Sequence, residues 1–124
     1  MILGKFTLAM FFLTAPVWAQ FSRADMMKLA TDRFDTAVKT LNLSPDQVAS
    51  IKPLLQSKYV DIGQIKDVYR GSVKTDTSKK DAKESLRSIN DKYNAQITTI
   101  LTPEQVKLWR RMLKDWKDDL TVPK

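Results

Sequence analysis

Residues 43–48 read LSPDQV, and residues 101–106 repeat that stretch almost letter for letter as LTPEQV. In the first copy Ser44 has the hydroxyl of a preferred helix N-cap residue, and Pro45 has the fixed φ that suits the first helical position. The Gln47 side chain can bond back to the N-cap amide while the serine hydroxyl bonds forward, which makes a capping box. The second copy has an equivalent residue in each role. The pattern therefore predicts two helices, each beginning directly after one of the two N-cap positions.

Capping alone does not account for glutamine at the third helical position of both copies. Glutamate there would also complete the capping box, and it would interact more favourably with the positive end of the helix dipole. We interpret the matched glutamines as a sign that the two turns meet in space; the alternative is an efficient helix start used twice. The residues that define the motif are Leu43, Ser44, Gln47, Leu101, Thr102 and Gln105.

The rest of the chain also has a helical pattern, because apolar residues recur at spacings of three and four and only three glycines occur. We predict an all-α fold with a long, bent helical hairpin. The four expected helices span residues 23–41, 45–70, 78–100 and 103–119. Ser22 is expected to cap the first helix, and Ser78 with Asp81 to form the capping box of the third. Residues 71–77 are the only clear mid-chain linker, and Gly71 is expected to stop the second helix.

The second helix contains two residues that disfavour helix, since Pro53 removes a backbone hydrogen bond and Gly63 has low helix propensity. Together they favour a bend near residues 49–53; the alternative is that both are tolerated irregularities. Lys58 is the one polar residue on the apolar face of this helix, and residues 121–124 are expected to fray. The expected core positions are Met27, Ala30, Phe34, Val38, Leu41, Val48, Ile51, Leu55, Ile62, Ile65, Tyr69, Ala82, Leu86, Ile89, Tyr93, Ile97, Ile100, Val106, Trp109, Leu113, Trp116 and Leu120.

Residues 1–19 have the layout of a secretory signal peptide. Lys5 supplies a positive charge, an apolar run follows it, and Ala19 ends a stretch of the kind that signal peptidase cleaves. The apolar run is too short for a membrane anchor, because a bilayer-spanning helix needs ~20 apolar residues. We expect cleavage after Ala19, export without a stable membrane anchor, and a single domain over residues 20–124.

The composition narrows the function classes. The formal net charge is +7, and the chain contains neither histidine nor cysteine. The usual general base, the Ser/His and Cys/His nucleophiles and the soft metal ligands are therefore missing, and we expect no enzymatic activity, no cofactor and no metal site. Asp115, Asp118 and Asp119 could approach a hard cation, but a solvated helix face is the favoured interpretation. An exported basic chain is expected to meet acidic protein or lipid surfaces rather than nucleic acid.

With two L-T-x-x-Q motifs, each at a predicted helix start, the chain resembles the Spy/CpxP family of bacterial periplasmic proteins. The first copy has Ser44 where the motif has threonine, which keeps the hydroxyl. The resemblance also covers the helix order, the signal peptide and the basic charge. It implies a periplasmic, antiparallel, cradle-shaped homodimer. The function that it implies is an ATP-independent chaperone, which holds unfolded or partly folded clients and suppresses their aggregation during envelope stress.

In such a chaperone, positive charge captures clients at long range and exposed apolar surface adds contact at short range. The pair Trp109 and Trp116 lies on an apolar stripe, which favours core over client site. Two other functions stay open: a CpxP-like adaptor or inhibitor that binds the periplasmic domain of a sensor kinase, and a protein whose basic face lies on anionic lipid or peptidoglycan. The candidate client-binding residues, for which ordinary solvated charge is the alternative, are Lys52, Lys58, Lys66, Arg70, Arg87, Arg110 and Arg111.

Overall fold

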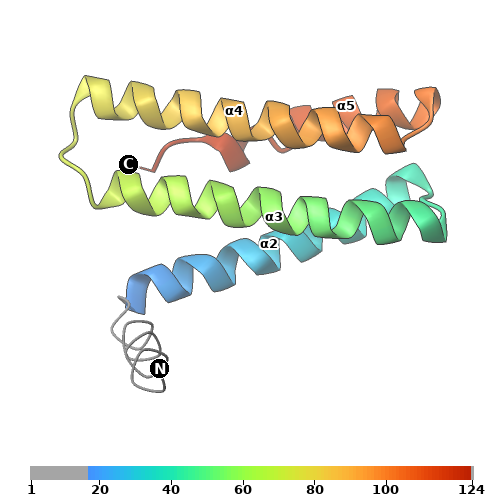
Figure 1. Ribbon diagram of the computed structural model, residues 1–124, viewed down its shortest axis with the longest axis horizontal. Helices are drawn as coiled ribbons and strands as arrows, with labels where there is room; N and C mark the ends of the chain where they lie inside the picture. Colours follow the sequence, from blue (N-terminus) through green and yellow to red (C-terminus); the bar gives the residue numbers. More distant parts are fainter. Residues whose placement is uncertain (1–16, 124) are drawn as a thin grey trace, which may run out of the picture.

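The computed structural model describes residues 17–123, and this part of the chain is helical without any strand (Figure 1). The all-α prediction is confirmed. The predicted signal peptide falls on residues 1–19, of which 1–16 lie outside the described residues. Among the described helices, none combines the length and apolar character that crossing a membrane requires. The elements are α2 (Val17–Leu41), α3 (Pro45–Arg70), α4 (Asp76–Ile100), α5 (Pro103–Asp115) and the short 3-10 helix η1 (Lys117–Leu120).

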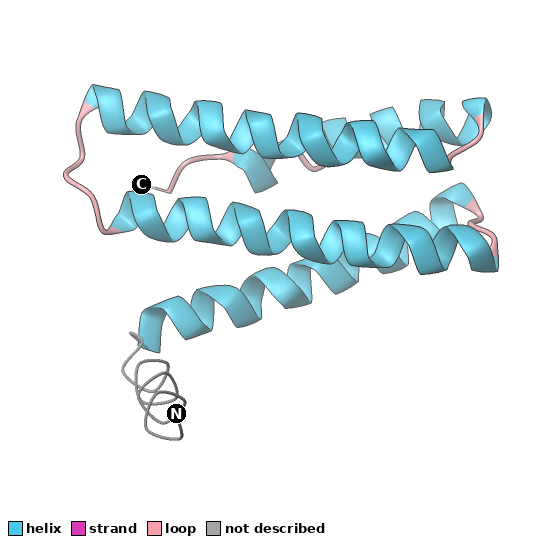
Figure 2. Cartoon of the chain, viewed as in Figure 1, coloured by secondary structure: helices cyan, strands magenta, loops and turns pink. Residues whose placement is uncertain are grey.

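The helices α3 and α4 form a long antiparallel hairpin, whose connection, residues 71–75, lies at one end of the molecule (Figure 1). α2 packs along α3, α5 contacts α2, and η1 contacts both α4 and α5. The turns between α2 and α3 and between α4 and α5 both lie at the other end. Loops are confined to these connections, to the break at Trp116 between α5 and η1, and to the segment that follows η1 (Figure 2).

Two helices begin earlier than the sequence predicted. α4 begins at Asp76, because the Thr75 side chain accepts a hydrogen bond from the Ser78 amide and the Ser78 hydroxyl accepts one from the Thr75 amide. The predicted capping box at Ser78 and Asp81 is therefore wrong, and Ser78 is the third helical residue instead. α2 extends back to Val17, so Ser22 is not its N-cap; no proline or glycine interrupts residues 17–41.

The end of α3 lies where the sequence placed it, but Gly71 is not in the left-handed conformation, since its φ is −82°. The Lys74 ammonium instead donates to the carbonyl oxygens of Tyr69 and Arg70, at 2.6 and 3.0 Å. A cation at this position satisfies the last carbonyls and also interacts favourably with the negative end of the helix dipole.

The predicted fourth helix divides into two parts. α5 ends at Asp115, the backbone of Trp116 leaves the helical region, and η1 follows. This change of direction brings Asp119 into the interior, where it is 9% exposed. Residues 121–123 follow η1 without regular secondary structure, and Val122 is half-buried against the core, which does not fit the predicted fray at that position. Lys124, the last residue of the predicted fray, lies outside the described residues.

The core occupies the space between α2, α3, α4 and α5. Its largest fully buried side chains include Trp109, Tyr59 and Ile51. Tyr59, Ala37 and Met112 belong to the core although the apolar pattern did not single them out. Several expected core residues, such as Val38 and Ile65, are only half-buried. The remaining buried core residues are Ala30, Phe34, Leu41, Leu55, Ile62, Leu86, Ile97, Leu101 and Trp116.

Gly63 has a packing role. α3 continues as an α-helix through both Pro53 and Gly63. A β-carbon at Gly63 would lie 2.6 Å from Cγ of Met26 on α2, closer than carbon atoms approach one another. The glycine therefore leaves space for the Met26 side chain. The two sequence interpretations, a helix bend and a tolerated irregularity, did not include this packing role.

Candidate functional site

The two motif turns meet at one end of the molecule, as the sequence predicted. In each turn the N-cap hydroxyl accepts a hydrogen bond from the backbone N–H of the glutamine, at 3.2 Å for both Ser44 and Thr102. Each glutamine Oε1 in turn accepts from the N-cap amide. The side chains of Gln47 and Gln105 then bond to each other, with Nε2 to Oε1 distances of 2.7 and 3.1 Å.

The second side-chain amide hydrogen of each glutamine is donated to the last carbonyl of the helix that leads into the other turn. Gln47 Nε2 donates to the carbonyl of Ile100 at 3.2 Å, and Gln105 Nε2 donates to that of Leu41 at 3.0 Å. These carbonyls lie at the last residues of α4 and α2 and have no partner within their own helices. Glutamate has no N–H to donate, so the contact explains glutamine in both copies. The junction ties four helix ends together.

A second polar cluster lies inside the molecule. The Arg33 guanidinium on α2 donates to both carboxylate oxygens of Asp119, at 2.9 and 2.8 Å. The Tyr59 hydroxyl on α3 donates to the same carboxylate at 2.6 Å. Burial and the hydrogen bond to Asp119 raise the pKa of Tyr59, and the same carboxylate raises the pKa of Arg33. The cluster fixes η1 against the first two helices.

The tryptophans extend this cluster. Arg33 stacks over the Trp116 ring with 5.2 Å to its centroid, and Trp116 meets Trp109 edge to face at 5.7 Å. The Trp109 indole N–H donates to Asn94 of α4 at 2.6 Å. Trp109 is fully buried and Trp116 is 7% exposed, so both are core residues, in line with the favoured sequence interpretation.

Lys58 was expected to contact clients, and the structure contradicts this because the side chain is only 3% exposed. Its ammonium lies 5.6 Å from the Tyr59 ring centroid and 6.0 Å from that of Trp109. Burial lowers the pKa of Lys58 to about 8; Asp119 opposes this shift, and the positive charge of Arg33 adds to it. A solvated face is likewise wrong for Asp119, although Asp115 and Asp118 are exposed.

The other six candidates lie on three helices. Lys66 of α3 is half-buried, and burial lowers its pKa. Arg70 forms an exposed ion pair with Asp67 at 3.3 Å. Lys52 is exposed, with its ammonium 5.9 Å from the Phe34 ring centroid. Arg110 and Arg111 are exposed on α5, and Arg87 is exposed on α4.

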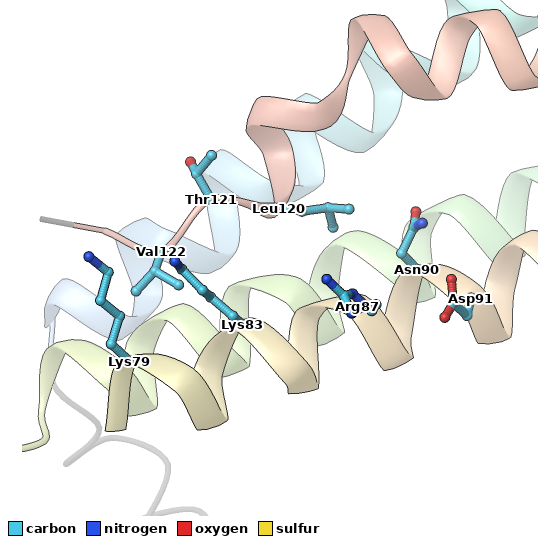
Figure 3. A pocket seen from close by; sticks show the side chains of 8 residues that line it. All are labelled: Lys79, Lys83, Arg87, Asn90, Asp91, Leu120, Thr121 and Val122. Carbon is cyan, nitrogen blue, oxygen red and sulfur yellow. The ribbon is translucent and has the colours of Figure 1, made fainter. Parts of the chain in front are cut away.

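Arg87 alone among the candidates lines an open groove with a volume of about 610 Å³ (Figure 3). One wall consists of α4 side chains that include Lys79 and Lys83, and the other consists of residues 120–122. Within residues 17–123, none of these three cations forms an ion pair with a carboxylate. Leu120 and Val122 give the opposite wall an apolar character. The lining residues are Lys79, Lys83, Arg87, Asn90, Asp91, Leu120, Thr121 and Val122.

The sequence carries a local signal for the cationic wall of this groove. Lys79, Lys83 and Arg87 follow each other at intervals of four, so they lie on one face of a helix. The position of residues 120–122 opposite that face depends on Asp119, whose burial no local pattern indicates. In the part of the chain that is described, no three His, Cys, Asp or Glu side chains are arranged to hold a metal ion.

Comparison with known proteins gave no match: no protein-family model, no curated protein and no solved structure matches this chain.

Proposed function

We propose that the protein is an ATP-independent chaperone that binds unfolded or partly folded clients and suppresses their aggregation. The observation that carries the proposal is the open groove with apolar side chains on one wall and, on the other, three cations that form no ion pair with a carboxylate of residues 17–123. The pair of L-T-x-x-Q motifs and the resemblance to Spy/CpxP proteins support it. We also propose that the protein is located in the periplasm, that it forms a homodimer and that it has no enzymatic activity.

The groove has the physical properties that a transient client site needs. Exposed cations accelerate the encounter with negatively charged chains, and their contribution weakens as salt screens it. Apolar side chains then add short-range contact that does not depend on a defined client sequence. The groove is open to solvent, so a bound segment can enter and leave it without unfolding of the protein.

The test is an aggregation assay. Several unrelated, chemically unfolded clients are diluted into buffer with and without equimolar protein, and light scattering is followed at low and high salt. We expect suppression for most clients, weaker at high salt. Suppression of none, together with tight binding to one sensor-kinase periplasmic domain, would favour the CpxP-like adaptor instead. Association with anionic liposomes without suppression would favour the surface-binding function.

The proposed homodimer has a separate support. Val68 and Val73, at the end of the hairpin near residues 71–75, are 72% and 80% exposed. Val68 also lines a mainly apolar groove of about 230 Å³ between α3 and α4, together with Ile65 and Tyr69. Sedimentation equilibrium at micromolar concentration tests the proposed dimer. We expect the mass of a dimer, and the mass of a monomer would contradict the cradle-shaped homodimer.

A further inference from the structure

We propose that the groove between α4 and residues 120–122 binds an extended peptide segment in which acidic and apolar residues alternate. The inference rests on the proposed function and specifies the client chemistry of its site. It follows from the spacing of the side chains on the two walls and from the chemical character of each wall.

The cationic wall has a repeat that matches an extended chain. Lys79, Lys83 and Arg87 are four residues apart, which corresponds to about 6 Å along the helix axis. In an extended peptide every second side chain lies about 6.7 Å further on, and these side chains share one face. Acidic residues at every second position can therefore face the three cations in turn, and the small mismatch is within the reach of flexible lysine and arginine side chains.

The opposite wall has the complementary character. Leu120 and Val122 are two residues apart, and the backbone at Thr121 between them is extended, with φ −79° and ψ 144°. Figure 3 shows Leu120 and Val122 across from the cationic side chains. The alternate face of the same peptide would carry the apolar residues and contact this wall. A single strand thus satisfies both walls.

The length of the cationic wall sets the length of the segment. The three cations span about 12 Å of α4, and three alternate residues of an extended chain span about 13 Å, so a segment of about five residues matches this wall. Beyond Arg87, Asp91 places a carboxylate at one end of the groove, so the acidic part of the ligand should stop there.

The experiment measures binding of fluorescein-labelled decapeptides by fluorescence anisotropy at low salt. One peptide alternates aspartate and leucine, and a second has the same composition with the aspartates and leucines in separate blocks. We expect the alternating peptide to bind at least about fivefold more tightly. The reversal Lys83→Glu with Arg87→Glu should weaken its binding about tenfold, because two attractive contacts become repulsive. Val122→Ser should weaken it about threefold.

The matched control is Lys28→Glu with Lys107→Glu, which makes the same change of net charge at exposed positions outside the groove. It should change affinity less than about threefold, and circular dichroism should show that all variants keep the wild-type helix content. Equal affinity for the two peptides, or equal effects of the two double reversals, would overturn the inference. A protein that suppresses aggregation but fails these tests keeps the proposed function and loses only this inference. Groove-dependent peptide binding without suppression of aggregation would support the peptide site and contradict the chaperone function.

Discussion

Replacement of Lys58 by methionine should stabilise the protein. The lysine is 3% exposed, and within residues 17–123 its ammonium forms neither a hydrogen bond nor an ion pair. The aromatic rings of Tyr59 and Trp109 lie 5.6 and 6.0 Å from it, and Asp119 attracts it, but burial outweighs this attraction and lowers the pKa of Lys58. Methionine has a similar length and no charge, so Lys58→Met keeps the packing and removes the desolvation cost.

The magnitude follows from the pKa of Lys58, which falls from 10.5 to about 8 in the folded protein. One pKa unit corresponds to about 1.4 kcal/mol, so the charged lysine costs about 3 kcal/mol at neutral pH. Below pH 8 both states bind the proton and the cost is constant. Between pH 8 and 10.5 the unfolded state binds more protons than the folded state, so the free energy of unfolding rises with pH.

Titration of tyrosine side chains limits the pH range over which the contribution of Lys58 to stability can be measured. A hydrogen bond to Asp61 and, more strongly, burial raise the pKa of Tyr93 to about 12, and the pKa of Tyr59 is raised as well. Folded tyrosines therefore keep their protons above pH 10 while unfolded ones lose them, which lowers stability there. The contribution of Lys58 is isolated between pH 8 and 10, where it should raise the stability of the wild type by about 2 kcal/mol.

The assay is urea denaturation followed by tryptophan fluorescence at pH 7, 8, 9 and 10. Lys58→Met should be more stable than the wild type by about 2–3 kcal/mol at pH 7, with the difference falling below about 1 kcal/mol at pH 10. The exposed Lys107→Met serves as the control and should follow the wild type. A variant less stable than the wild type at pH 7, or a difference that does not change with pH, would refute the reasoning.

Three further substitutions test the other contacts. Asp119→Asn leaves a partly buried guanidinium without its carboxylate and should cost about 2–3 kcal/mol, measured by urea denaturation; a loss under about 0.5 kcal/mol would contradict the role of the cluster. Gln47→Glu cannot donate to Ile100 and should destabilise by about 1–2 kcal/mol, whereas a plain helix start would gain slightly from the negative charge, so thermal melting decides by sign. Gly63→Ala should be nearly neutral alone but stabilise by about 1 kcal/mol in a Met26→Ala background, where space is available; equal effects in both backgrounds would exclude the contact.

Local patterns predicted those parts of the fold that local chemistry determines. The starts of α3 and α5 followed from a hydroxyl, a proline and a glutamine within four residues. The glutamines even indicated the meeting of the turns, because their identity was unexplained by capping. The start of α4 was misplaced since Thr75 and Ser78 offered a second capping box three residues before the predicted one.

The interior cluster and the groove depend on distant contacts. Arg33 and Asp119 are 86 positions apart, and Tyr59 and Asp119 are 60 apart. Among three neighbouring aspartates, nothing in the sequence distinguishes the one that turns inward. Periodicity placed Lys58 on the apolar face of α3, which indicates burial. A lysine is usually exposed, and on that ground Lys58 was predicted to contact clients. The structure shows that its position on the helix, and not its residue type, determines its exposure.

The junction of the two glutamines has a consequence for the order of events during synthesis. The ribosome completes α2 and α3 well before it adds Gln105, whose partner Gln47 lies 58 positions earlier. Until Gln105 and Asp119 have been added, the side-chain amide of Gln47, the carbonyl of Leu41 and the guanidinium of Arg33 therefore lack the partners that they have in the folded protein. The contacts that join the two ends of the chain can form only when synthesis is nearly complete.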